Sequence, residues 1–214
     1  MKFYPAYLDL RGRTCVVVGG GQVAERKALA LFDAGADLTI VSPRLTSVLQ
    51  DLAGRNKILH RNKHFEEQDV HGAFLVIAAT DALSVNESVA RVCRPLGILV
   101  NVATAPDSGS FIVPSVVERG DLLIAVSTCG DSPALARRVR EELERTYGPE
   151  YGVFLEKMSV LRRLLMEKVA EEDVRRKVFQ AVVDADVLSL LKAGKVHEAD
   201  RCIEEIVAMV TSGK

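Results

Sequence analysis

Three consecutive glycines, Gly19 to Gly21, follow a short apolar run and precede a helical pattern, an arrangement that can bind the phosphates of a dinucleotide. Gly19 and Gly21 take the first two positions of the pattern G-x-G-x-x-A, and Ala24 is the small third residue. Gly19 permits a tight turn, Gly21 lets a pyrophosphate approach the backbone, and Ala24 lets the helix lie close to the strand. The helix expected from about Gln22 to Ala34 would direct free N–H groups and its positive dipole end at the phosphates.

The context of these glycines favours phosphate binding over the alternative, a glycine turn used only for packing. Val16, Val17 and Val18 form a β-type run directly before the turn, and apolar residues at helical spacing follow it as far as Gly35. This is the strand–turn–helix context that a dinucleotide site requires.

The elements that position this turn alternate between strands and helices. Strands are expected at 38–41, 74–79 and 98–102, with a weaker candidate at 58–59. Helices are expected at 44–53 and 83–93. This alternation predicts an α/β fold of the Rossmann type, a doubly wound parallel sheet with right-handed crossovers, over residues 1–113.

The pattern changes after residue 113. Two strand-like runs between Ser110 and Ser127 flank Arg119-Gly120-Asp121, and this short connection predicts a β-hairpin rather than a parallel crossover. A polar loop then leads to a helix that ends near Tyr147, with Asp131 or Ser132 as its N-cap. We expect residues 114–149 to form a dimerisation segment and residues 150–214 to form a small helical domain.

The composition restricts the partners and the compartment. The chain has 28 basic and 29 acidic residues, so its net charge of −1 gives no general attraction to nucleic acid. No apolar run approaches the roughly 20 residues that span a bilayer, and the first residues lack the apolar core of a signal peptide. We therefore expect a cytoplasmic protein with neither a nucleic acid nor a membrane partner.

The cysteines and histidines do not predict a metal site. The four cysteines are widely scattered and make no C-x-x-C pair, and Cys15 is expected to be a small buried apolar residue. His60, His64 and His71 lie among charged residues, which is typical of a solvated surface.

Four segments stand out together in the chain. They are Val18–Lys27, Ile77–Asp81, Asn101–Ser115 and Ser127–Arg137. In this order and spacing they resemble the precorrin-2 dehydrogenase / sirohydrochlorin ferrochelatase family, which also forms the N-terminal half of bacterial siroheme synthases. The resemblance covers nearly the whole chain and is most specific up to about Leu143.

The resemblance implies a homodimeric enzyme that uses NAD to oxidise precorrin-2, a tetrapyrrole, to sirohydrochlorin. Some members of the family then insert iron, which is a substrate in that step, to give siroheme. The segment after the Rossmann domain would form the dimer interface. The apolar residues of the expected hairpin also favour a dimer, because a monomer tolerates exposed apolar surface and strand edges poorly.

Several residues are expected to border the dinucleotide. They are, by similarity, Gln22, Val23, Pro43 and Arg44, and, by their place at the carboxyl end of a strand, Thr80 and Asp81. Asp81 serves equally well as a helix N-cap. The second strand lacks the acidic residue that usually binds the adenosine ribose of NAD, and Arg44 would favour a 2′-phosphate, so NADP stays an alternative to NAD.

A multiply carboxylated tetrapyrrole needs donors that offset the desolvation of its charges. The residues assigned to the substrate are Asn101, Ser127, Thr128, Ser132 and Arg137. Ser127, Thr128, Ser132 and Arg137 are explained equally well by a capped surface helix with solvated arginines.

One position departs from the family pattern. The family's Asn-Val-x-Asp-x-Pro segment often carries an aspartate that serves both dehydrogenation and chelation, and Thr104 stands there in this chain. A threonine hydroxyl is not a general base near neutral pH. Asp107 is the nearest carboxylate and is the candidate catalytic residue, although a turn beside Ser108-Gly109 explains it slightly better. The missing aspartate also supports the alternative function, a non-catalytic Rossmann module that senses a dinucleotide.

Overall fold

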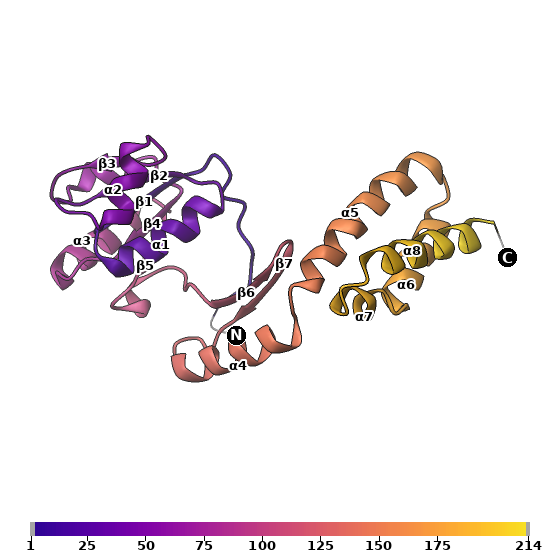
Figure 1. Ribbon diagram of the computed structural model, residues 1–214. Coiled ribbons are helices and arrows are strands. Elements are labelled where there is room, and N and C mark those ends of the chain that lie inside the picture. Colours follow the sequence, from indigo (N-terminus) through magenta and orange to yellow (C-terminus); the bar gives the residue numbers. More distant parts are fainter. Residues whose placement is uncertain (1–2, 213–214) are drawn as a thin grey trace. The chain divides into compact units, whose positions relative to one another are not determined.

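The computed structural model describes residues 3–212, and the chain divides between Val113 and Pro114 into two compact units (Figure 1). The first unit holds a parallel sheet covered by helices, and the second holds an antiparallel hairpin followed by helices. Among residues 3–212, no helix combines the length and the apolar character needed to cross a membrane.

The first unit has the predicted doubly wound fold. Its strands are β1 (Thr14–Val18), β2 (Asp37–Val41), β3 (Leu59–Arg61), β4 (Leu75–Ala78) and β5 (Leu99–Val102). Its helices are α1 (Gln22–Asp33), α2 (Ser47–Gly54) and α3 (Leu83–Cys93), with the 3-10 helices η1 (Glu67–Val70) and η2 (Pro106–Ser108). All neighbouring strands are parallel in the order β3-β2-β1-β4-β5, so the strand order reverses between β1 and β4.

Alternating residues of β1 divide the core of this unit into two layers. Cys15 and Val17 pack with residues of α1 and α2, whereas Val16 and Val18 pack with residues of α3. Both faces of the sheet are therefore covered, which explains the continuous apolar strands in the sequence. Burial raises the pKa of the Cys15 thiol to about 11, as expected for a structural rather than a reactive cysteine.

The predicted start of the second helix is wrong. The helix was expected to begin at Arg44, but it begins at Ser47, after the N-cap Thr46, whose hydroxyl accepts a bond from the N–H of Leu49 (3.4 Å). The Ser42 hydroxyl donates to the carbonyl of Arg44 (2.7 Å) and so satisfies a backbone group outside the helix. Residues 43–46 consequently form a loop at the end of β2.

The second unit begins with the predicted hairpin. Its elements are β6 (Ser115–Arg119), β7 (Leu122–Val126), α4 (Pro133–Thr146), α5 (Glu150–Lys168), α6 (Glu172–Asp184), α7 (Val187–Lys192) and α8 (Val196–Thr211). Gly120 has a φ of 57° in the two-residue turn between the strands. The Arg119 guanidinium donates to the carbonyls of Glu144 (3.2 Å) and Tyr147 (3.0 Å), and thereby joins the hairpin to the end of α4.

The hairpin is shorter than the sequence predicted. Residues 110–114 were expected to lie within it, but β6 starts only at Ser115. Phe111 packs instead against the core of the first unit, and its carbonyl accepts a bond from the Asn101 side chain (3.1 Å). Pro114 has no N–H to donate to a strand ladder, which helps to explain why pairing begins after it.

Candidate functional site

A cleft of about 830 Å³ lies in the first unit at the carboxyl ends of β1, β2 and β4. The residues that line it include Gly19–Val23, Val41–Thr46, His64, Phe65, Ala79–Ala82 and Val85. The strand order reverses here, and this is where open α/β sheets bind ligands. The cleft therefore brings together every residue that the sequence assigned to the dinucleotide.

The three glycines of the cleft meet different constraints. Gly19 has a φ of 122°, and a Cβ on it would lie 2.3 Å from the carbonyl oxygen of Ala79. A Cβ on Gly20 would lie 2.0 Å from the carbonyl oxygen of Arg44. A Cβ on Gly21 would meet no atom within 4 Å. The first two glycines are thus required by the protein's own packing, whereas the space beside Gly21 is open.

The loop after β2 is fixed against the glycine turn by backbone bonds. Gly19 donates to the carbonyl of Val41 (3.0 Å), and Thr46 donates to the carbonyl of Gly20 (3.0 Å). His60 is half-buried, and its Nε2 lies 2.8 Å from the carbonyl oxygen of Ser42, so this histidine is not part of the solvated surface expected for it. These contacts hold the exposed Arg44 at the cleft wall.

The loop after β3 was missed by sequence reasoning. It brings His64 and Phe65 to the cleft, and its shape depends on the buried carboxylate of Asp69. That carboxylate accepts bonds from Arg61 (2.9 Å), from Lys63 (3.0 Å) and from the backbone N–H of Glu66 (2.9 Å). Burial acts to raise the pKa of Asp69, but these donors outweigh it and keep the pKa below its ordinary value.

On the opposite side, Thr80 and Asp81 follow β4 and line the cleft. The N-cap of α3 is Ala82, without a side-chain bond, so the N-cap interpretation of Asp81 is wrong. Asn86 lies behind this loop with 1% of its surface exposed, and its side chain bonds to Thr80 and to Thr104. The sequence carries a signal for the role of Asn86. This polar residue lies at helical spacing on the same face of α3 as the buried residues Val89, Ala90 and Cys93.

The residues after β5 take three different places. Asn101 is 5% exposed, and its side-chain amide donates to the backbone of Phe111, so it holds the chain rather than facing a ligand. Thr104 is exposed, and its hydroxyl accepts a bond from Asn86 (3.2 Å). Asp107 is also exposed and lies in the single turn η2, whose carbonyls accept bonds from Arg94.

The remaining substrate candidates lie together in the second unit, around the start of α4. Their hydroxyls accept bonds from backbone N–H groups: Ser127 from Cys129 (3.0 Å), Thr128 from Ser132 (3.1 Å) and Ser132 from Leu135 (3.3 Å). Arg137 is exposed and forms an ion pair with Glu141 (2.9 Å), which lowers the pKa of Glu141. Such an exposed pair contributes little stability and exchanges partners easily.

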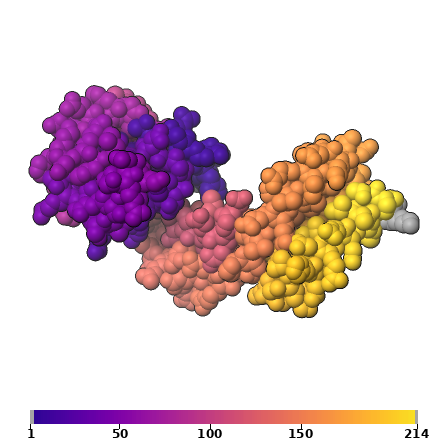
Figure 2. Space-filling view, turned by 45° about the horizontal axis from the view of Figure 1, so that its top comes forward, coloured from indigo at the N-terminus to yellow at the C-terminus, as the bar shows by residue number. Residues whose placement is uncertain are grey.

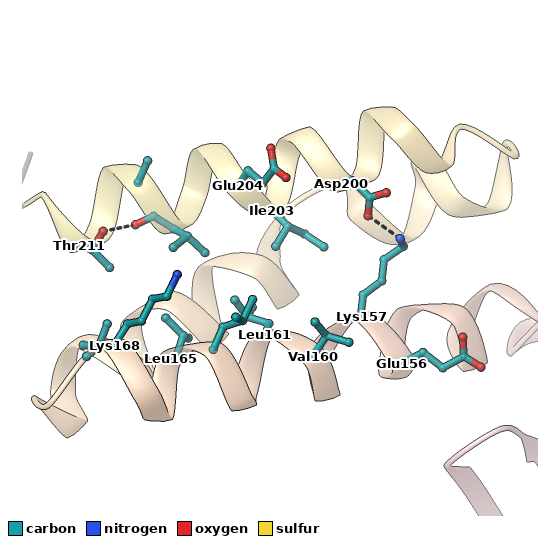
Figure 3. A pocket seen from close by; sticks show the side chains of 14 residues that line it. Glu156, Lys157, Val160, Leu161, Leu165, Lys168, Asp200, Ile203, Glu204 and Thr211 are labelled. Carbon is teal, nitrogen blue, oxygen red and sulfur yellow. Dashed lines mark hydrogen bonds and ion pairs between the residues drawn. The ribbon is translucent and has the colours of Figure 1, made fainter.

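A groove of about 750 Å³ in the second unit is not suited to the dinucleotide. Figure 2 shows α5 and α8 side by side, and the groove runs between them. Figure 3 shows apolar side chains such as Leu161, Leu165 and Ile203 along it, with the ion pair of Lys157 and Asp200 at one end. It offers no glycine turn at a helix N-terminus, so we place the dinucleotide in the first unit. Among residues 3–212, no three histidine, cysteine or acidic side chains gather as metal ligands would.

Comparison with known proteins agrees with this assignment. Residues 6–115 match the family model described as "Putative NAD(P)-binding", and residues 119–146 match the one described as "Sirohaem biosynthesis protein central". The chain belongs to the family of the first of these models, the NAD(P)-binding family. The resemblance inferred from the four sequence segments is thereby confirmed.

Relatives and solved structures of this family extend the match. The siroheme synthases of Nitrosococcus oceani and Methylococcus capsulatus are 37% and 38% identical, over 95% and 96% of this chain. The chain spans 44% and 43% of their lengths, which is less than half. The solved structure of SirC, a precorrin-2 dehydrogenase, superposes with a TM-score of 0.80 at 28% identity, and the match covers 95% of this chain and 100% of that one.

The glycine geometry predicts opposite effects for neighbouring substitutions. Gly21→Asp should abolish dinucleotide binding and leave the fold intact, because the carboxylate would occupy and repel the path of the pyrophosphate. Gly20→Ala should lower the melting temperature, because its Cβ would force the Arg44 backbone to move. Calorimetric titration with NAD and thermal melts by circular dichroism measure the two effects.

Gly54→Ala is the matched control, because a Cβ there meets no atom within 4 Å. It should keep both affinity and stability. A folded Gly21→Asp variant that bound NAD like the parent would show that this turn does not hold the phosphates.

Proposed function

We propose that this chain is an NAD-dependent precorrin-2 dehydrogenase, which oxidises precorrin-2 to sirohydrochlorin in siroheme biosynthesis. The observation that carries the proposal is the dinucleotide cleft of the first unit, combined with similarity to SirC over 95% of the chain. The similarity to siroheme synthases supports the same pathway.

NAD supplies the hydride acceptor in such a reaction, and the chain's own residues bind and orient it. The first-turn N–H groups of α1, from Gln22, would bond to the pyrophosphate, for which Gly21 leaves space. Arg44 would lie at the ribose end, and Thr80 and Asp81 would border the cofactor on the β4 side. NAD is the cofactor we propose, with NADP as the alternative that Arg44 favours.

The hydroxyls around the start of α4 support a role in binding the carboxylates of the substrate. Those of Ser127, Thr128 and Ser132 accept backbone bonds, so each keeps its own hydrogen for donation to an anion. Arg137 could exchange Glu141 for a substrate carboxylate at small cost, since both side chains are exposed to solvent. We propose that these four residues bind the tetrapyrrole.

The proposal makes a direct kinetic prediction. Anaerobic incubation of the protein with precorrin-2 and NAD should produce NADH together with the absorbance of sirohydrochlorin. A parallel reaction with NADP tests the cofactor preference, and Gly21→Asp is the matched inactive control. Oxidation no faster than in the cofactor-free reaction would instead support the dinucleotide-sensing alternative.

Thr104 leads to a second prediction, that the protein is a better dehydrogenase than iron chelatase. Chelation must remove two pyrrole protons, and a positioned base typically contributes on the order of 10²- to 10⁴-fold to such a step. Iron insertion into sirohydrochlorin should therefore barely exceed the uncatalysed rate. Thr104→Asp should raise it, and Asp107→Asn should change it little. Efficient iron insertion by the parent that Asp107→Asn abolishes would identify Asp107 as the base.

We also propose a cytoplasmic homodimer that associates through the second unit. The hairpin forms a two-stranded sheet whose outer face exposes Val116 and Leu123 at 40% and 43%, a surface that a second copy would cover. The four cysteines are free thiols, as in a reducing compartment.

The dimer is tested by light scattering at micromolar concentration, where twice the mass of one chain is expected. Val116→Lys with Leu123→Glu should shift the protein towards a monomer, because both charges would be buried in the interface. A parent protein that is monomeric at this concentration would contradict the proposal.

A further inference from the structure

The side chain of Asn86 bonds to two loops, those that follow β4 and β5. Its Oδ1 accepts bonds from the backbone N–H of Thr80 (3.1 Å) and from the Thr80 hydroxyl (2.8 Å). Its Nδ2 donates to the Thr80 carbonyl (2.9 Å) and to the Thr104 hydroxyl (3.2 Å). The Thr80 hydroxyl also lies 3.1 Å from the carbonyl oxygen of Ala82, so its single hydrogen is shared between two acceptors. Both donor hydrogens of the Asn86 amide are engaged, and its oxygen accepts the backbone N–H of Thr80.

The backbone of Thr80 determines which way this amide faces. Its N–H can only donate, so Oδ1 must face it, and its carbonyl can only accept, so Nδ2 must face that side. The remaining hydrogen of Nδ2 then has one direction left, towards Thr104. The Thr104 hydroxyl is therefore an acceptor of this bond, and its own hydrogen stays available to a ligand.

The position of Asn86 in the fold makes this connection stiff. It lies in the first turns of α3 with 1% of its surface exposed, on the helix face that Val89 and Cys93 pack into the core. Thr80 lines the dinucleotide cleft, whereas Thr104 is exposed in the loop after the neighbouring strand β5. A displacement of either loop must break a bond to the same buried amide.

We propose that Asn86 is a positioning residue, which locks the cofactor loop at Thr80 to the loop that carries Thr104 and presents the Thr104 hydroxyl to the substrate as a hydrogen-bond donor. The kinetic part of this inference rests on the proposed dehydrogenase function. With an aspartate at position 104, the same amide would hold one carboxylate oxygen and leave the other free. In both cases Asn86 donates, and the side chain at position 104 is the acceptor of this bond.

Asn86→Asp is the variant that tests this role. It keeps an oxygen for the Thr80 donors but replaces the two donor hydrogens, so the Thr104 hydroxyl would turn inward and donate to residue 86. We expect the KM for NAD to rise and kcat for precorrin-2 oxidation to fall on the order of tenfold, as small misplacements of reacting groups do. Glu87→Gln, at the exposed neighbouring position, is the matched control.

A double-mutant cycle separates positioning from a purely structural role. Thr104→Val should lower kcat, Thr104→Ser should restore it, and Asn86→Asp should cause little further loss of kcat once Thr104→Val is present. If Asn86→Asp lowered kcat by the same factor in the parent and in the Thr104→Val variant, Asn86 would not act through Thr104. If Asn86→Asp lowered the melting temperature but left kcat and KM unchanged, the role of Asn86 would be purely structural.

Amide hydrogen exchange keeps the inference testable without catalysis. In Asn86→Asp, exchange should accelerate both in residues 80–82 and in residues 103–105, and in Glu87→Gln it should do so in neither. Acceleration in residues 80–82 alone would overturn the proposed link. A further outcome is that the parent protein fails to oxidise precorrin-2 while exchange in Asn86→Asp accelerates in both segments. In that case the proposed function is wrong, and the structural connection through Asn86 is still supported.

Discussion

The close approach of the glycine turn to the two neighbouring strand ends governs the site of this protein. Gly19 lies against the backbone of Ala79, and Gly20 lies against the backbone of Arg44, at distances that leave no room for a Cβ. Because the loops after β2 and β4 pack directly on the turn, the cleft between them is set by backbone contact. A dinucleotide then meets a surface that is already formed, which reduces the ordering cost of binding.

Single buried polar residues complete this edge of the sheet. Ser42 holds the loop after β2, Asp69 holds the loop after β3, and Asn86 holds the loops after β4 and β5. Within residues 3–212, no buried side-chain nitrogen or oxygen atom lacks a hydrogen-bond partner. Fully satisfied polar groups of this kind rigidify the loops they bond to, because an unpaired group in the interior is costly.

The second unit uses polar groups differently. Around the start of α4, the hydroxyls that cap turns and the helix remain at or near the surface, and the arginines of α4 pair with glutamates one turn further along. These bonds organise the loop and keep its donors accessible to solvent.

The sequence alone determined the sheet, the glycine turn and the family. Continuous apolar runs and helical periodicity are local patterns, so β1, β4 and the bounds of α3 at Leu83 and Cys93 followed from them directly. Gly19 and Gly21 were assigned from motif spacing, and the tight turn predicted at Gly19 is present in the structure. The phosphate contact of Gly21 stays a prediction.

The surroundings of these elements depend on how the whole chain folds. The constraint on Gly20, the contact of His60 with Ser42 and the bonds of Asn86 all involve residues distant in the chain; Asn86 and Thr104, for example, are 18 positions apart. The start of α2 at Ser47 and the delayed start of β6 depended on competition between local bonds and packing, as at Thr46 and Phe111. The helical spacing of Asn86 with Val89, Ala90 and Cys93 indicates that it lies on the buried face of α3, but it does not indicate which residues Asn86 bonds to. Contacts between residues from separate strands and loops leave no periodic pattern in the sequence, so only the folded chain shows them.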